Sequence, residues 1–98
     1  MTDLLWLVEW FRRHCDGDWE HQYGVSITTL DNPGWSVQID LAETTAASKS
    51  FDPIEVDDGD RCLRVWREDT PPVLRGAGSP LELPAIMQHM RRWLDQNG

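Results

Sequence analysis

The sequence of 98 residues is poor in positive charge, with nine Lys and Arg residues against 17 Asp and Glu residues, and Lys49 is its single lysine. The formal charge of −8 repels the phosphate backbone of nucleic acids and anionic lipid headgroups, so direct binding to either is disfavoured. The charge favours a basic protein as partner. Such a partner can itself be an enzyme that acts on nucleic acids.

Long hydrophobic runs and cysteine motifs are also missing. No segment approaches the roughly 18 apolar residues of a transmembrane helix. The first residues reach Glu9 without the basic and apolar regions of a signal peptide. The two cysteines, Cys15 and Cys62, lie far apart and form no CxxC motif. We therefore expect a cytoplasmic protein with reduced thiols and no membrane-spanning segment.

Tryptophan is the residue in excess, with six in 98 residues. Its side chain supplies a large buried area in cores and often anchors interfaces. A chain of this length buries roughly 60–65% of the surface that its unfolded form exposes, which predicts one core in a single domain, residues 1–98. We expect Trp35 and Trp93 in this core, and Trp6, Trp10 and Trp66 at its edges or on the opposite face.

Two segments have the apolar period of amphipathic helices, one near each end of the sequence. The first covers residues 3–15. The second has a capping box at Ser79-Pro80-Leu81-Glu82, with Pro80 as the first helical residue. Because Pro84 would break a hydrogen bond of a helix that starts at Pro80, either the first turn is separate or the helix starts nearer Leu83. The expected core-facing residues of the first helix are Leu4, Leu7, Val8, Phe11 and Cys15. Those of the second are Leu83, Ile86, Met87, Met90, Trp93 and Leu94.

The segments between the helices have the alternation of β-strands. It is clearest over residues 23–29 and 35–41, and Pro33-Gly34 between them predicts a hairpin turn. Weaker strands are expected at 51–56 and 61–68. Residues 42–50 and 70–78 are predicted to be loops, the second with a short extended piece at 73–75. The predicted fold is a small α+β domain in the order α-β-β-β-β-α. It has an antiparallel sheet of about four strands, with the N- and C-terminal helices packed on it.

Two motifs contain more specific residue patterns than the formation of a hairpin alone requires: Gly17-Asp18-Trp19-Glu20-His21-Gln22-Tyr23-Gly24 and Thr29-Leu30-Asp31-Asn32-Pro33-Gly34-Trp35. With the Trp-rich first helix and Gly76-Ala77-Gly78 before the last one, they resemble the immunity protein 53 family over nearly the whole chain. The resemblance implies a bacterial protein of a polymorphic toxin system that neutralises a cognate toxin by binding it, without catalysis. A basic nuclease-type toxin would fit the charge of −8. The double proline in residues 67–75 departs from the family's pattern.

The candidate partner-binding residues belong to two acidic groups, because clustered carboxylates attract a basic partner and an aromatic anchor adds affinity. The first group is Asp16, Asp18 and Glu20, with Asp31 in the next turn and Trp19 as the anchor. The second group is Asp57 and Asp58, with Glu55 and Asp60 beside them. The structural alternative is that both groups only end a helix and shape solvated turns. A calcium loop is excluded, since Ile54 occupies a ligand position.

Catalytic and metal sites have weaker support. Cys62 would serve as nucleophile in a small sulfurtransferase-like thiol enzyme, although no histidine lies near it in the sequence. His14, Cys15 and His21, completed by Cys62 or His89, match no known zinc spacing. We expect no catalytic residue, metal or cofactor. An acidic protein-interaction module unrelated to toxins is a further alternative, and the oligomeric state stays open.

Overall fold

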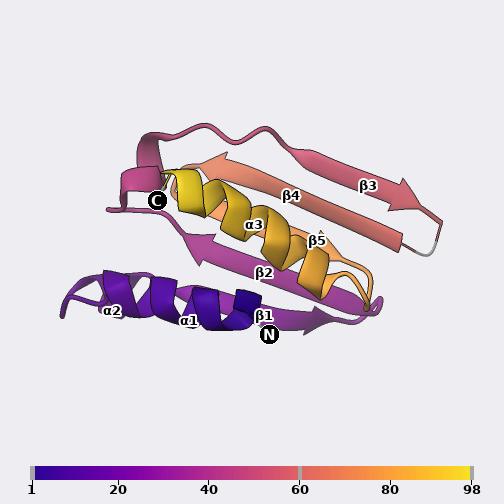
Figure 1. The fold of residues 1–98 in the computed structure, drawn as a ribbon, viewed down its shortest axis with the longest axis horizontal. Coiled ribbons are helices and arrows are strands. Elements are labelled where there is room, and N and C mark those ends of the chain that lie inside the picture. Colours follow the sequence, from indigo (N-terminus) through magenta and orange to yellow (C-terminus); the bar gives the residue numbers. More distant parts are fainter. Residues whose placement is uncertain (1, 60, 98) are drawn as a thin grey trace.

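A sheet of five antiparallel strands is covered on one face by two helices in the computed structural model, which describes residues 2–59 and 61–97 (Figure 1). The strands are β1 (Val25–Leu30), β2 (Gly34–Asp40), β3 (Ile54–Asp58), β4 (Arg61–Asp69) and β5 (Pro72–Gly78), in the sheet order β1-β2-β5-β4-β3. The helices are α1 (Thr2–His14), α2 (Trp19–Gln22), η1 (Thr45–Ser48) and α3 (Leu83–Asn97). The predicted α+β class is confirmed, with five strands rather than about four.

The additional strand is β5, which occupies the segment predicted to be a loop. It pairs with both β2 and β4 and is therefore the central strand of the sheet. Pro72 is its first residue, where a proline removes no hydrogen bond from the interior of the ladder. Gly76 and Gly78 interrupt the alternation that predicts a strand, because they occupy the face on which α3 packs. The prediction of a loop over residues 70–78 was wrong for this reason.

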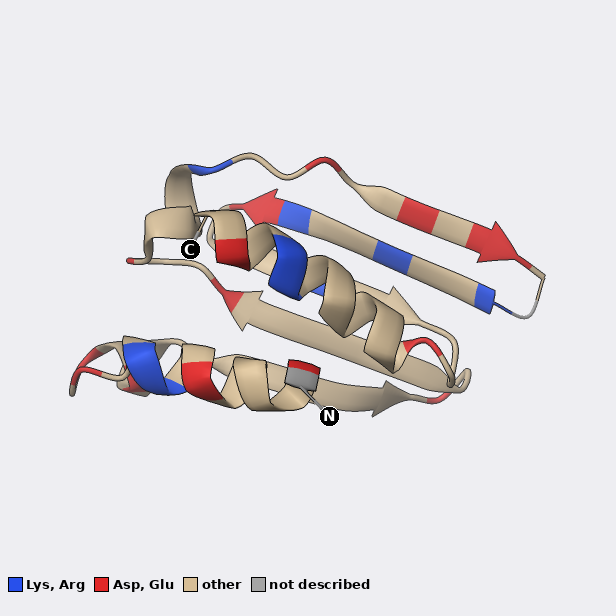
Figure 2. Cartoon of the chain, viewed as in Figure 1, with Lys and Arg blue, Asp and Glu red and all other residues tan. Residues whose placement is uncertain are grey.

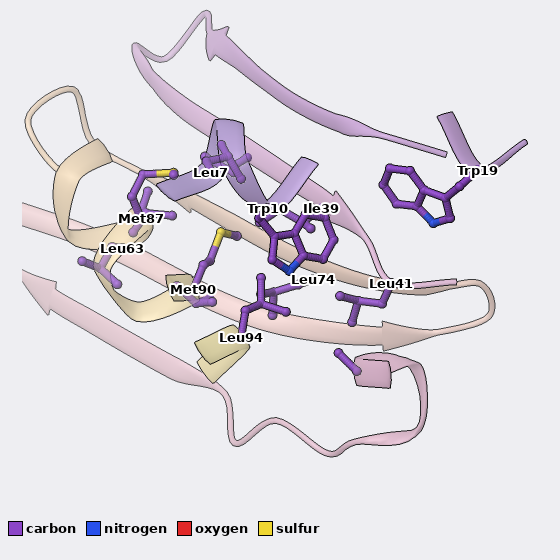
Figure 3. Close-up of a cluster of buried hydrophobic side chains, with 14 residues drawn as sticks. Leu7, Trp10, Trp19, Ile39, Leu41, Leu63, Leu74, Met87, Met90 and Leu94 are labelled. Atoms are coloured by element: carbon purple, nitrogen blue, oxygen red, sulfur yellow. The ribbon is translucent and has the colours of Figure 1, made fainter. Parts of the chain in front are cut away.

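The helix α1 turns a different face to the core from the one predicted. Leu7 and Trp10 are buried, and Trp10 is only 1% exposed, whereas Val8 is 53% exposed and Phe11 37%. The indole of Trp10 lies 4.0 Å from the ring of His14 and 5.9 Å from the ring of Trp19, between centroids. Leu7 faces the core as predicted, whereas the predicted burial of Leu4, Val8 and Phe11 and the predicted edge position of Trp10 were wrong. Trp10 has a larger apolar surface than Val8 or Phe11, and Trp10 rather than these two residues is buried in the core (Figure 3).

The helix α3 begins at Leu83, the later of the two starts that the sequence left open, and lies across the middle of the sheet (Figure 1). Its buried residues are Ile86, Met87, Met90 and Leu94, all members of the predicted core face. The two long helices are joined by polar contacts: Trp6 Nε1 donates to Asp95 Oδ1 at 3.1 Å, and Arg91 pairs with Asp3 at 3.0 Å. None of the helices in residues 2–59 and 61–97 is long and apolar enough to cross a membrane.

Candidate functional site

The acidic candidate residues lie at opposite ends of a molecule that is 42 Å long (Figure 2). Asp16, Asp18 and Glu20 lie where α1 meets α2, a region that we call the junction end. Asp31 follows β1, and Asp57 and Asp58 close β3; these three residues define the turn end. The six residues of β1 span about 20 Å between the two ends. Asp31 therefore lies at the other end of the molecule from Asp16, Asp18 and Glu20, with which it was predicted to form one acidic group.

Two carboxylates of the junction end hold the backbone of their own turn. Glu20 accepts hydrogen bonds from the N–H groups of Asp16 and Gly17, both at 2.9 Å. Asp16 accepts from the N–H groups of Trp19 and Asp18, also at 2.9 Å. The N–H of Trp19 and then that of Asp18 lower the pKa of Asp16. The backbone N–H of Glu20 itself, followed by those of Asp16 and Gly17, lowers the pKa of Glu20.

These bonds make the junction end sensitive to acid. A carboxyl whose pKa is lower in the folded than in the unfolded chain stabilises the fold above its ordinary pKa and loses that contribution as the pH falls. The ordinary values are 3.8 for Asp16 and 4.5 for Glu20. We expect Glu20→Gln to be less stable than the wild type at pH 7 and equally stable well below pH 4.5, where Glu20 is protonated, by urea denaturation followed by tryptophan fluorescence. An equal loss at both pH values would contradict this, and Asp18→Asn is the matched control.

At the junction end, Trp19 was predicted to anchor a partner and Asp18 to attract it by charge, and the structure places the two side chains differently. Trp19 is 3% exposed, and its indole N–H donates to the carbonyl oxygen of Ala42 at 2.9 Å. Its ring is part of the core, so it does not fit the predicted role of an exposed anchor (Figure 3). Asp18 is exposed, and its carboxylate accepts no hydrogen bond within the described part of the chain. Asp18 is therefore the carboxylate of the junction end that a partner can reach most readily.

The acidic residues of the turn end lie beside arginines of the neighbouring strand. Glu55 pairs with Arg64 across β3 and β4 at 3.1 Å, and Asp58 lies opposite Arg61. Both partners of the Glu55–Arg64 pair are more than half exposed, so this contact contributes little to stability and can exchange for a contact with another protein. Asp60, the fourth acidic residue of this segment in the sequence, lies outside the described residues.

A groove of about 520 Å³ lies at the turn end, along the face of the sheet that no helix covers. Its lining includes Leu30, Asn32 and Pro33 near the β1–β2 turn, Glu55, Val56 and Asp57 of β3, and Cys62, Arg64 and Ala77 of β4 and β5. Leu30 is 40% exposed and supplies apolar surface to the groove, whereas the side chain of Val56 lies opposite buried Leu63, on the other face of the sheet. No sequence pattern indicates this groove, because only the strand order brings the ends of these strands together.

The uncovered face also carries a connected row of polar side chains beside the groove. The guanidinium of Arg64 lies 5.0 Å from the ring centre of Trp66, whose indole N–H donates to Glu68 at 3.1 Å. Arg75 bridges Glu68 at 2.9 Å and Gln38 at 2.8 Å. The Trp66 and Arg75 contacts lower the pKa of Glu68. Tryptophan and arginine often dominate the energy of protein interfaces, and these are held in place before any partner arrives.

The cysteines and histidines have local structural contacts. The sulfur of Cys62 lies 3.4 Å from Asp57 Oδ1, a carboxylate and not the imidazole base of a thiol enzyme. Burial, followed by the charges of Glu20 and Asp16, raises the pKa of the Cys15 thiol. The Nδ1 atom of His14 lies 2.7 Å from the carbonyl oxygen of Trp10. Among the described residues, no three His, Cys, Asp or Glu side chains are grouped as a metal site.

The sequence matches a known protein family over nearly its whole length. The sequence model of the family described as immunity protein 53 matches residues 4–95, which include both acidic ends and the groove. No curated protein and no solved structure matches the chain. Membership of this family suggests a toxin-neutralising role and a toxin as partner. Because the match extends over every strand and almost the full length of both long helices, the chain belongs to the immunity protein 53 family.

Proposed function

We propose that the protein neutralises a cognate bacterial toxin in the cytoplasm by stoichiometric binding through an acidic surface, without catalysis. Family membership supports the toxin as partner. The main support for this mode of binding is the groove at the turn end, which has a concave shape, apolar surface and acidic residues beside it. An interface with an apolar centre and a charged rim is the common arrangement in protein complexes.

The proposed contact surface places the toxin over the groove. Leu30 provides exposed apolar surface and Asp57 an acidic group in the groove, and Asp31 and Asp58 are the next residues along the chain from these two. A partner with a basic active site, such as a nuclease-type domain, would be attracted by these carboxylates and would then bury the apolar surface. Occupation of that basic site by the acidic rim would exclude the phosphates of a nucleic-acid substrate.

The junction end is the second acidic surface that a toxin could use. Two of its carboxylates, those of Asp16 and Glu20, are already engaged by backbone N–H groups, and Trp19 is buried. Asp18 and the nearby exposed Glu43, which follows Ala42, remain for a partner. Because the two acidic ends are separated by the length of β1, charge reversal at one end tests that end alone.

Charge reversal at the turn end is expected to weaken toxin binding. The variant Asp57→Lys/Asp58→Lys changes the net charge by the same amount as the matched control Asp18→Lys/Glu43→Lys. We expect the turn-end variant to associate with the toxin about ten- to a hundredfold more slowly at low salt, and the control to change association much less. Stopped-flow association with the toxin encoded by the neighbouring gene gives the rate, and co-expression gives the rescue of growth.

These experiments distinguish two questions: which acidic end contacts the toxin, and whether the protein binds this toxin at all. A larger effect from the junction-end pair would move the interface to that end. Neutralisation that survives both charge reversals at physiological salt would exclude an acidic interface. Toxicity without rescue by the wild-type protein, together with no stable complex, would contradict the toxin-binding function toward that toxin.

A further inference from the structure

The strand β1 is an edge of the sheet with apolar and uncharged residues along it. The N–H of Asp40 donates to the carbonyl oxygen of Gly24 at 3.0 Å, so this pair is a hydrogen-bonded pair of the β1–β2 ladder. Antiparallel pairs alternate, and the backbone groups of Val25, Ile27 and Thr29 therefore point away from β2. Within residues 2–59 and 61–97, no strand pairs with this side of β1.

An apolar stripe of α1 lies on the same side of the molecule. At 100° per residue, Leu4, Val8 and Phe11 share one side of the helix, and all three side chains are exposed. Trp6 and Asp3 bond to α3 and lie on another side of the helix. The stripe therefore faces away from α3, toward the side of the molecule on which β1 is the edge strand; in the view of Figure 1, α1 is drawn in front of β1. We call the outward edge of β1 and this stripe together the β1-edge surface.

The β1-edge surface is neutral on a strongly acidic protein. The six residues of β1 carry no charge, whereas the outward backbone groups of the other edge strand, β3, belong to Glu55 and Asp57. Two copies with a charge of −8 each repel one another wherever carboxylates meet. The acidic β3 edge is thus protected from pairing, and the β1 edge lacks this protection. Another copy of the chain can approach most easily here.

We propose that two copies of this chain form a two-fold symmetric dimer through the β1-edge surface. A two-fold axis requires a surface that is complementary to itself, and an antiparallel β1–β1 pair beside two packed α1 stripes meets this condition. The outward groups of Val25, Ile27 and Thr29 would then join the two sheets into one continuous sheet, and Val8 and Phe11 would be buried. Edge-to-edge pairing leaves the helix-free face of each sheet open, so each copy keeps its groove, and the proposal does not depend on toxin binding.

The mass of the full chain in solution tests this proposal. Sedimentation equilibrium from micromolar to submillimolar concentration should give a species of twice 11.3 kDa. Val8→Lys places a charge in the stripe, and Thr29→Pro removes an N–H that points away from β2. We expect each change to raise the dimer dissociation constant by about tenfold or more. Leu81→Lys, at an exposed position before α3, is the control and should leave it unchanged. Circular dichroism verifies that each variant is folded.

Two results would overturn the dimer. The first is a wild-type protein that stays monomeric over the whole concentration range. The second is a dimer whose dissociation constant is unchanged by Val8→Lys and by Thr29→Pro. A monomeric protein whose toxin complex is weakened by Val8→Lys would instead assign the β1-edge surface to the toxin.

Discussion

Replacing Trp10 with alanine is expected to lower the free energy of unfolding by about 3–5 kcal/mol, the range for deletion of a large buried side chain. Trp10 is 1% exposed within the buried cluster (Figure 3), and its ring packs against those of His14 and Trp19. Together with Leu7, it fixes α1 to the rest of the core. Removal of the indole therefore loosens both the helix and the junction end that follows it.

Chemical denaturation followed by circular dichroism measures the effect of Trp10→Ala, because tryptophan fluorescence changes with the variant itself. Leu81→Ala is the matched control, since this leucine is 87% exposed and its loss should cost less than about 0.5 kcal/mol. An effect of Trp10→Ala as small as that of the control would show that α1 is not held by this side chain.

The hairpin and the helix α3 could be predicted because each has a local signal. Strict alternation on both sides of Pro33-Gly34 predicts the pair β1 and β2, and the apolar period after Leu83 predicts the buried face of α3. The rotation of α1 could not be predicted in this way. Its apolar residues cover more than one side of the helix, and only the packing of Trp10 selects the side that is buried.

The roles of the individual carboxylates in the candidate site could not be predicted from the sequence either. Composition identifies the acidic groups, but it cannot distinguish Glu20, whose oxygens bind backbone N–H groups, from Asp18, which lies free of such bonds within the described residues. The groove depends on strands that are far apart in the sequence. Leu30 and Arg64 line it together only because β5 enters the middle of the sheet.

The second large effect is expected at Gly76, where β5 passes beneath α3. A Cβ atom at this position would lie 2.5 Å from Ile86 Cγ2 and 3.0 Å from Met90 Cε. Met90 can adapt because its side chain is flexible, but Ile86 is fully buried and branched at Cβ. We expect Gly76→Ala to lower the free energy of unfolding by about 1–3 kcal/mol through overpacking. Gly76→Val is expected to cost more.

A double-mutant cycle assigns this cost to one contact. Ile86→Leu removes the Cγ2 atom that the added Cβ would meet and keeps the side-chain volume, so Gly76→Ala should cost less in its presence, with a coupling of about 0.5–3 kcal/mol. Gly24→Ala is the control, because nothing lies within 4 Å of its added Cβ. Additive effects of Gly76→Ala and Ile86→Leu would contradict this explanation. Coupled effects would show that the glycines of β5 bring α3 against the sheet and so shape the support beneath the groove.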